Sequence, residues 1–287
     1  MPAAGTAALH IDPARYDPPR MGVKHFRVDD PESFDLSTID PRDTSGGPSS
    51  KDEALEKAEA MHERLADLQE VLYAENRRRV LIVLQGMDTS GKDGAVRHVM
   101  SGISPASVRV VSFKKPTEPE LWHDYLWRIH PHVPGNGEIV IFNRSHYEDV
   151  LVVRVHELVP KDVWKKRYQQ INDFERMLAE NGVTILKFFL HISPEEQAER
   201  LQARLDDPTK RWKFQHGDLE ERKLWNEYRE AYQDAVRKTS TKWAPWTIVP
   251  SDRKWFRNHV VAATIIDTLE GLDCKYPQPD LSGEQVE

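Results

Sequence analysis

The sequence contains a single cysteine among its 287 residues and no long hydrophobic run. Cys274 therefore has no partner for an internal disulfide, and no Cys/His spacing typical of a metal site is present. A membrane span needs about 18 consecutive apolar residues, and the sequence has no such stretch. The first residues also lack the basic and then apolar pattern of a signal peptide. These absences predict a cytoplasmic protein that does not enter a membrane.

Basic residues are not in excess either. Lys and Arg number 40 against 47 Asp and Glu, which gives a net charge of −7. This balance argues against a general nucleic-acid-binding protein, so any site for anions must be a local concentration of basic residues. The length is sufficient for a sizeable core, and one large α/β domain is favoured over two small ones.

The two ends of the chain differ from its middle in composition. Seven of the 19 prolines lie in residues 1–50, which finish in Ser-Gly-Gly-Pro-Ser-Ser, so an extended N-terminal arm outside the core is predicted. Residues 273–287 are predicted to be a flexible tail, and residues 51–272 the folded domain. Within residues 51–76, leucine, methionine and alanine recur at three- and four-residue steps and predict an amphipathic helix. Packing on the sheet of the same molecule is favoured, and pairing with another subunit is the alternative.

Strand and helix patterns alternate along the domain. Strands are predicted at residues 80–85, 108–113, 138–142, 183–191 and 246–249, and helices at 91–103, 118–129, 161–181, 194–205, 218–237 and 252–269. Such alternation predicts an α/β fold with a parallel five-stranded sheet flanked by helices. Thr117 with Glu120, and Ser193 with Glu196, fit the capping box at two helix starts.

The loop after the first strand predicts a site for a polyphosphorylated ligand. Residues 86–93 are Gly-Met-Asp-Thr-Ser-Gly-Lys-Asp and match the spacing Gly-x4-Gly-Lys of a phosphate-binding loop. In such a loop the glycines let backbone N–H groups turn toward phosphate oxygens, and the lysine adds a positive charge. Two residues depart from the common form: Asp88 lies inside the loop, and Asp93 replaces the usual magnesium-binding Ser or Thr.

Further charged residues follow the next two strands. Lys114 and Lys115 come after the second strand, and residues 143–149 come after the third. Because ligands bind beyond the carboxyl ends of parallel strands, these segments are expected to converge on one ligand. Asn143 occupies the position where an acidic residue often holds magnesium. The missing negative charge comes either from the carboxylates shortly after it or from Asp88 and Asp93.

Four segments together resemble the polyphosphate kinases of family 2. They are residues 86–94, 113–117, 127–131 and 142–150, and the resemblance covers about residues 55–270. It implies a P-loop NTPase-like, thymidylate-kinase-like fold with a helical lid at about residues 204–218. The implied reaction is reversible transfer of the terminal phosphoryl group of inorganic polyphosphate to a nucleotide, assisted by Mg²⁺ or alternatively Mn²⁺. Residues 146–151 look like the subgroup that accepts both AMP and ADP.

The resemblance and the chemistry of phosphoryl transfer assign roles to named residues. The expected catalytic residues are Asp88, Lys92 and Arg144, and the expected metal ligands are Asp88 and Asp149. The expected phosphate-binding residues are Gly86, Gly91, Asp93, Lys114, Lys115 and Arg128. The expected lid and nucleotide-binding residues are Arg204, Arg211, Lys213, Asn143 and Glu148. Expected partners are polyphosphate, AMP, ADP, ATP, further guanine nucleotides, and a second copy of the chain in a dimer or tetramer.

Two other functions remain open from the residues alone. An ATP-dependent nucleoside monophosphate kinase would share the fold but need a site for a second nucleotide instead of a basic track. A P-loop regulatory protein that binds nucleotide without turnover would fit the replaced metal ligands at Asp93 and Asn143. The aromatic residues Trp225, Tyr228 and Tyr232 are assigned to a packed helix face, with a subunit interface as the alternative.

Overall fold

The carboxyl ends of five parallel strands lie along one edge of the sheet. In the computed structural model, which describes residues 23–280, the strands are β1 (Arg79–Gln85), β2 (Val108–Ser112), β3 (Ile139–Asn143), β4 (Val183–His191) and β5 (Trp246–Pro250). Their order is β2-β3-β1-β4-β5, and each neighbouring pair is parallel. The register aligns Asn143 with both Leu84 and Ser112, so the loops after β1, β2 and β3 begin side by side. The predicted five-stranded parallel sheet is confirmed.

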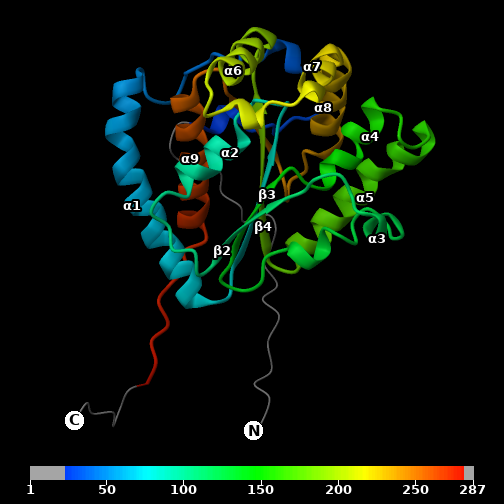
Figure 1. The fold of residues 1–287 in the computed structure, drawn as a ribbon. Helices are drawn as coiled ribbons and strands as arrows, with labels where there is room; N and C mark the ends of the chain where they lie inside the picture. The colour runs from blue at the N-terminus through cyan, green and yellow to red at the C-terminus, as the bar shows by residue number, and fades with distance from the viewer. Residues whose placement is uncertain (1–22, 281–287) are drawn as a thin grey trace.

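Helices cover both faces of the sheet (Figure 1). They are α1 (Lys51–Glu75), α2 (Lys92–Val99), α3 (Glu118–Leu121), α4 (Val152–Val155), α5 (Lys161–Glu180), α6 (Pro194–Asp206), α7 (His216–Lys223), α8 (Trp225–Thr239) and α9 (Lys254–Gly271). The core forms two clusters, one toward α1, α2 and α9 and one toward α5 and α8. Neighbouring residues of β1 separate accordingly, because Ile82 joins the first cluster and Val83 the second. Within the described chain, every helix is too short or too polar to cross a lipid bilayer.

Helix α1 packs on its own molecule, as predicted. Ser50 caps its start by accepting a hydrogen bond from the Glu53 N–H, and Asn76 ends it in the left-handed conformation. Leu65 and Leu72 have no exposed surface and belong to the core cluster that contains α9. The predicted stripe therefore faces inward over these turns.

The predicted N-terminal arm is wrong for residues 23–50. Phe26 packs edge-on against Phe256 of α9, with ring centroids 5.8 Å apart. The Val28 N–H donates to the Trp246 carbonyl of β5 at 2.8 Å, and Leu36 is also buried in the core. Proline and glycine limit regular structure here but do not prevent apolar side chains from packing. The first 22 residues lie outside the described part of the chain.

Three predicted helices end or divide at other residues. The helix at 91–103 ends at Val99, the helix at 118–129 is shortened to α3, and the helix at 218–237 is divided into α7 and α8. After α3, the Asp124 carboxylate accepts a hydrogen bond from the Leu126 N–H at 3.0 Å, and this local turn competes with a continuing helix. The tail prediction at 273–287 stays a prediction: residues 273–280 form neither helix nor strand, and the remainder is outside the described chain.

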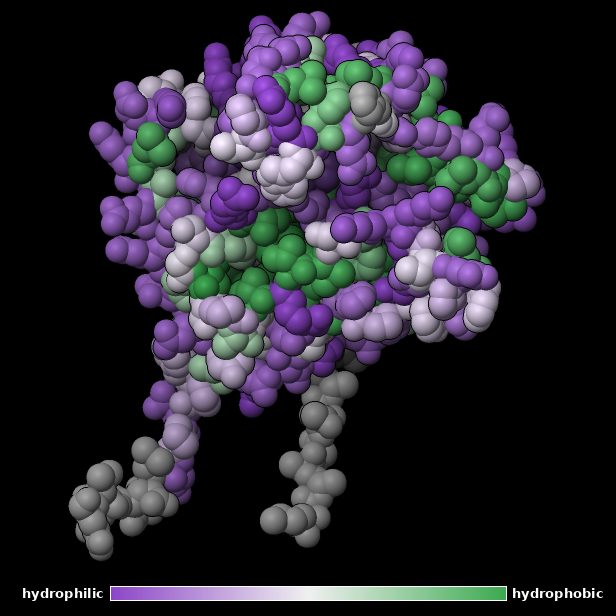
Figure 2. Space-filling model, viewed as in Figure 1, coloured by the Kyte–Doolittle hydropathy of each residue, from purple (hydrophilic) through white to green (hydrophobic). Residues whose placement is uncertain are grey.

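The edge strand β2 is partly open to solvent. Val110 is 48% exposed, and Figure 2 shows hydrophobic residues gathered between α2 and β2 on the face viewed in Figure 1. An edge strand offers unpaired backbone groups as well as side chains, so this surface differs from the covered centre of the sheet.

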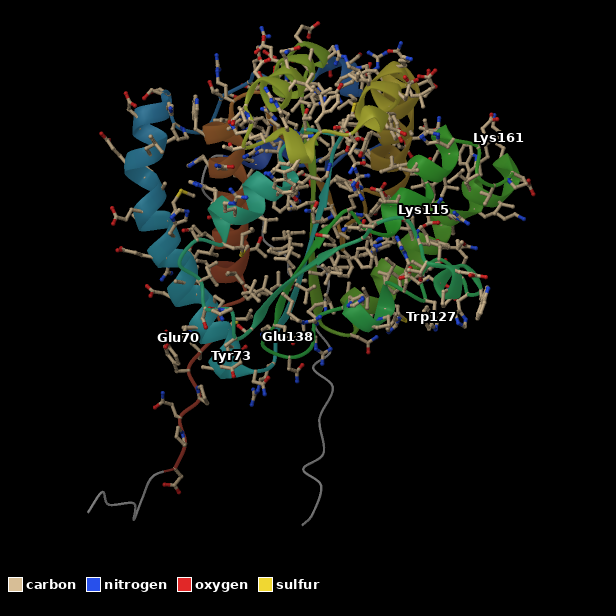
Figure 3. All side chains as sticks on the ribbon, viewed as in Figure 1. Glu70, Tyr73, Lys115, Trp127, Glu138 and Lys161 are labelled. Carbon is tan, nitrogen blue, oxygen red and sulfur yellow. The ribbon has the colours of Figure 1, made fainter. Side chains whose placement is uncertain are left out.

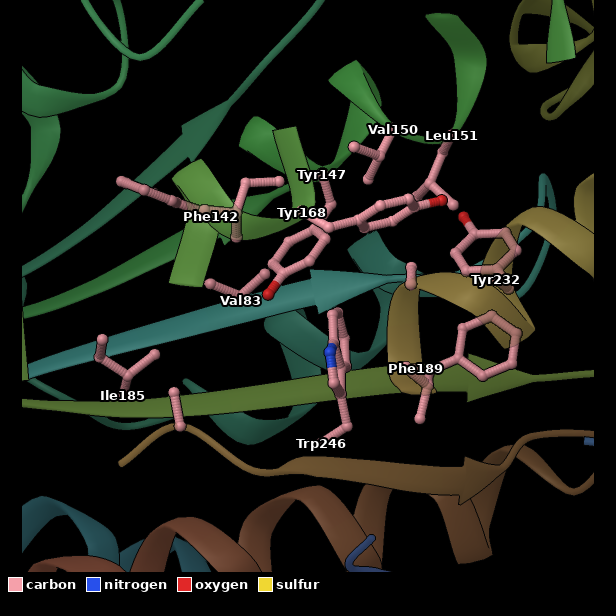
Figure 4. Close-up of a cluster of buried hydrophobic side chains, with 14 of the residues drawn as sticks. Val83, Phe142, Tyr147, Val150, Leu151, Tyr168, Ile185, Phe189, Tyr232 and Trp246 are labelled. Atoms are coloured by element: carbon pink, nitrogen blue, oxygen red, sulfur yellow. The ribbon is translucent and has the colours of Figure 1, made fainter. Parts of the chain in front are cut away.

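A buried ion pair joins β4 to α5 beneath the strand ends. Lys187 and Glu175 have no exposed side-chain surface, and Nζ lies 2.6 Å from Oε2. Lys187 also donates to the Thr239 carbonyl at 2.7 Å, and the Tyr147 hydroxyl donates to Glu175 Oε1 at 2.8 Å. The Tyr147 ring packs edge-on against Trp246, 4.8 Å between centroids, inside the apolar cluster of Figure 4. The pair therefore joins β4, α5, α8 and the segment after β3.

Replacing Lys187 by Met should destabilise the fold by about 3–5 kcal/mol, because Glu175 would keep a buried charge without its cation. Urea unfolding followed by circular dichroism measures this change. Lys165→Met, at an exposed position of α5, is the control and should change stability by less than about 0.5 kcal/mol. A Lys187→Met loss as small as that of the control would contradict the role given to the ion pair.

Candidate active site

The loop after β1 has a backbone that suits anion binding. Gly91 has a φ of 98° and begins α2. A Cβ on Gly86 would lie 2.6 Å from Ser90 Oγ and 2.8 Å from the Leu190 carbonyl oxygen, so this position requires glycine. Thr89 also adopts a positive φ, 63°, which a non-glycine residue seldom holds without support from its surroundings. The predicted phosphate-binding loop therefore has the expected geometry.

Lys92 lies buried in the centre of the loop. Its Nζ donates to the carbonyl oxygens of Gly86 at 2.6 Å and Met87 at 3.3 Å. Burial, together with the nearby charge of Arg144, lowers the pKa of Lys92 to about 8. Nearby carboxylates oppose part of this shift. The Lys92 ammonium group is therefore held in the loop by carbonyl oxygens. The oxygens of a phosphoryl group bound in the loop would take their place as its hydrogen-bond partners.

Arg144 joins the loop to the segment after β3. Its backbone is at φ 63°, and its guanidinium donates to Asp88 at 2.6 Å and to Glu148 at 3.3 Å. The strained backbone aims the side chain across the site, so one cation holds two carboxylates that would otherwise repel each other. The structure brings Asp88, Arg144 and Glu148 together, while their catalytic and binding roles stay predictions.

The basic residues after β2 lie at the same edge. The Phe113 N–H donates to the Asn143 carbonyl at 3.2 Å, which places Lys114 and Lys115 next to the segment after β3. Both lysines are exposed, and Figure 3 shows Lys115 on the side of the molecule that carries α4 and α5. Arg128 is buried, donates to the Lys114 carbonyl at 3.0 Å, and has an unpartnered Nε. An exposed lysine pair and a held arginine fit a phosphate track.

Asp149, an expected metal ligand, is paired with an arginine. Its carboxylate accepts a hydrogen bond from Arg167 at 2.8 Å, and it lines a cavity of about 540 Å³ that also includes Arg128 and Lys166. Burial raises the pKa of Asp149 to about 6 although Arg167 opposes the shift. Asp88 lines a different cavity and is paired with Arg144, and the metal role of both carboxylates stays a prediction.

The narrow cavity beside Asp88 is lined partly by residues that the sequence patterns did not assign to a site. Its volume is about 30 Å³, and α8 contributes Trp225, Tyr228 and Tyr232 to it, with Glu148 opposite. The Tyr228 hydroxyl donates to Glu221 of α7 at 2.6 Å. The helical spacing of the three aromatics indicated one face correctly, but a packed face and a cavity lining share the same spacing. Their spacing therefore gave no sign of a site.

The predicted lid residues bond mainly to their own segment. Arg204 contacts Asp218 at 3.4 Å, Arg211 donates to the Leu205 carbonyl at 2.8 Å, and the Lys213 ammonium lies 5.0 Å from the Trp212 ring centroid. Burial, with the nearby charge of Asp88 acting in the same direction, raises the pKa of Asp218, so α7 approaches the loop. The structure does not place Arg211 and Lys213 on the phosphate loop.

A chain of two hydrogen bonds runs from α7 through α6 to the loop. Gln197 of α6 donates to the Asp88 carbonyl at 3.2 Å, and Arg222 of α7 donates to the Gln197 side-chain oxygen at 2.8 Å. Sequence patterns missed both residues, because a glutamine and an arginine on exposed-type helices carry no signal of such a contact. Asn143 was expected at the nucleotide but donates to Asp93, which fixes β3 to the start of α2.

The residues around Lys92 fit a magnesium ion held largely by phosphates. Mg²⁺ in phosphotransfer sites takes one or two protein carboxylates together with water and phosphate oxygens. Among residues 23–280 no group of three or more acidic, His or Cys side chains forms a cage for a metal. Asp88 is partly exposed beside the loop, so it is the carboxylate available to such an ion. The ion would neutralise phosphate charge during transfer.

Comparison with known proteins identifies related chains. The family model described as polyphosphate kinase 2 matches residues 48–277. The chain is 56% identical over 264 residues to the AMP/ADP-polyphosphate phosphotransferase of Meiothermus ruber, covering 92% of this chain and 99% of the relative. It is 44% identical to the ADP-polyphosphate phosphotransferase of Rhodopseudomonas palustris, covering 90% and 93%. A crystal structure of polyphosphate kinase 2 from Arthrobacter aurescens superposes with a TM-score of 0.88 at 43% identity, covering 92% and 94%.

The lowered pKa of Lys92 predicts that phosphate binding weakens in alkali. The folded-state pKa of about 8 is below the ordinary 10.5, so the ligand-free protein releases this proton as pH rises through 8, and binding a polyanion must take it back. The affinity for inorganic tripolyphosphate should fall about fivefold between pH 8 and pH 9. Calorimetric titration measures it. Lys92→Arg keeps its charge over this pH range and serves as the control. If the affinity for tripolyphosphate changed equally with pH in both proteins, the pH dependence would not come from Lys92.

Proposed function

We propose that this chain, which belongs to the polyphosphate kinase 2 family, accepts both AMP and ADP. The protein is a phosphotransferase that moves the terminal phosphoryl group of inorganic polyphosphate to a nucleotide. The observation that carries the acceptor choice is the 56% identity, over nearly the whole of both chains, to an AMP/ADP-polyphosphate phosphotransferase. Neither an ATP-dependent monophosphate kinase nor a non-catalytic P-loop protein is favoured by these relatives.

The geometry supports a transfer that relies on positioning and charge. In the reaction the bond from the terminal phosphorus to its bridging oxygen breaks, and a bond to a phosphate oxygen of the acceptor forms. The negative charge at the breaking and forming bonds needs fixed cations nearby. Lys92 in the loop and Arg144 across from it supply two such cations, and Arg144 is already oriented by Asp88 and Glu148.

The acceptor is assigned to the cavity beside Asp88. Glu148 and the aromatic rings of Tyr228 and Trp225 line it, and the lid helices close over it. A cavity of about 30 Å³ holds about one water molecule, so a nucleotide could enter only if the cavity opens, for which α7 would move away from the loop. Closure would then exclude water and protect the phosphoryl group from hydrolysis.

The donor is assigned to the phosphate loop and to the basic residues beyond it. Lys114, Lys115 and Arg128 lie at the same strand edge as Lys92, so a chain of phosphates extending from the loop could contact them in turn. The metal proposed beside Asp88 would serve the phosphates nearest to the transfer. The expected dimer or tetramer and guanine acceptors stay predictions.

The function test supplies purified protein with polyphosphate, Mg²⁺ and either AMP or ADP, and measures nucleotide products by chromatography. AMP should yield ADP and ATP, and ADP should yield ATP. Lys92→Ala should lower the turnover rate about a hundred- to a thousandfold, because water cannot replace a preorganised cation at the transferred group. Chelation of Mg²⁺ should stop transfer, and its return should restore it. If ADP is converted and AMP is not, the proposed acceptance of AMP is contradicted.

A second test concerns the polyphosphate track. Lys115→Ala should weaken long donors more than short ones, because a remote contact exists only where the chain is long enough to reach it. Apparent donor affinity should also fall with salt, since charges on an exposed surface are screened within about 8–10 Å. Steady-state rates with donors from a few phosphates to long chains, at two ionic strengths, measure both effects. A loss that is the same for every donor length would remove Lys115 from the track.

A further inference from the structure

Two buried arginines lie against the phosphate loop. Arg200 belongs to α6, and Arg257 belongs to the first turn of α9. Their exposed fractions are 9% and 3%, so both charges have lost nearly all contact with water. Neither position belongs to a motif that the sequence pattern connected with phosphate binding.

Both guanidinium groups hold carbonyl oxygens of the loop. Arg200 donates to the carbonyls of Thr89 at 2.9 Å and Ser90 at 3.1 Å, and Arg257 donates to the Ser90 carbonyl at 3.3 Å. A Cβ on Gly91 would overlap the Arg257 guanidinium, so glycine at this position is required by the arginine as well as by its φ of 98°. The loop and Arg257 are therefore fitted to each other.

This contact sets the direction of an N–H group. In a trans peptide the carbonyl and the next N–H point in opposite directions, and the described chain contains no cis peptide. When the Ser90 carbonyl is held toward Arg257, the Gly91 N–H must face the other side of the loop. That side is where phosphate oxygens are expected.

The charge of Arg257 lacks an anionic partner within the described chain. Arg200 is paired with Glu196 at 2.6 Å, whereas the side-chain partner recorded for Arg257 is the neutral Asn258. Among residues 23–280 no carboxylate lies within ion-pair distance of Arg257. Burial, with the charge of Arg200, lowers the pKa of Arg257 to about 10. Keeping such a charge buried costs free energy, so it requires a reason.

We propose that Arg257 is a positioning residue for the donor: it fixes the Ser90–Gly91 peptide with its N–H toward the phosphates, and its charge is balanced when those phosphates occupy the loop. The inference rests on the proposed function and names a residue that acts through the loop backbone rather than by contact. It predicts that Arg257 destabilises the ligand-free protein and stabilises the phosphate-bound protein.

The first experiment compares thermal unfolding of Arg257→Met with wild type, without ligand and with inorganic tripolyphosphate. Without ligand the variant should be at least as stable as wild type, because a buried unpaired charge has been removed. The increase in melting temperature caused by tripolyphosphate should be largely lost. Arg253→Met is the control. Arg253 is the exposed residue directly before α9, and among the described residues its side chain donates a hydrogen bond only to the Arg42 carbonyl. In this control, the increase in melting temperature caused by tripolyphosphate should match that of wild type.

Kinetics give a second readout. In Arg257→Met the KM for donor should rise about tenfold, the loss typical of one hydrogen bond involving a charged group, and by the same factor for every donor length. The KM for the acceptor should stay unchanged. Arg257→Lys retains the positive charge and should recover part of the donor affinity. If the methionine variant does not fold, the donor KM of Arg257→Lys is compared with that of wild type instead.

Two results would overturn the inference. A methionine variant that melts lower without ligand but keeps the full tripolyphosphate effect and the wild-type donor KM would show that Arg257 only supports the fold. A lysine variant no better than methionine would show that its charge is irrelevant. A wild-type protein that neither melts higher with tripolyphosphate nor transfers phosphate would instead overturn the proposed function, and the inference with it.

Discussion

The buried pair of Lys187 and Glu175 is the constraint on which the site depends. Lys187 comes from the central part of β4 and Glu175 from α5, and together they hold the Tyr147 hydroxyl beneath the segment that follows β3. That segment carries Arg144 at its start and Glu148 in its turn. Because a charge without solvent contact tolerates few positions for its partner, the pair fixes the turn more strictly than apolar packing alone would. The strained backbone of Arg144 can persist because its surroundings leave no alternative.

Compensated and uncompensated charges divide the site into two parts. Across the loop, the Arg144 cation is shared between Asp88 and Glu148, so its charge is already compensated and this group of one cation and two carboxylates is net negative before any substrate arrives. Behind the loop and within it, Arg257 and Lys92 have no paired carboxylate at ion-pair distance in the described chain. A polyanion therefore gains most where the cations are uncompensated. This arrangement explains how a protein of net charge −7 can present a strongly attractive site for phosphates.

Local patterns predicted those parts of the molecule whose cause is local. The apolar run before residue 86, the glycine spacing and the lysine indicated the strand, the loop and the place of Lys92, because each follows from backbone conformation and charge in one short segment. The positions of Arg200, Arg257 and Gln197 depend on how α6 and α9 return to the loop, and their own neighbours in sequence are unremarkable. Composition likewise misassigned residues 23–50, because proline content says nothing about which apolar side chains find a groove. The pairing of Asp149 could likewise not be read from the sequence, since its partner Arg167 is 18 residues away on α5.

Gln197 connects the lid to the loop through hydrogen bonds. This side chain binds the Asp88 carbonyl of the loop and in turn accepts from Arg222 of the lid. Opening the small cavity beside Asp88 by a movement of α7 would act on Gln197 and so on the loop backbone. On the proposed assignment of donor and acceptor, the two ligands would bind at the two ends of this connection. Any effect of one ligand on the affinity of the other would then be reciprocal, because each would act on the same equilibrium.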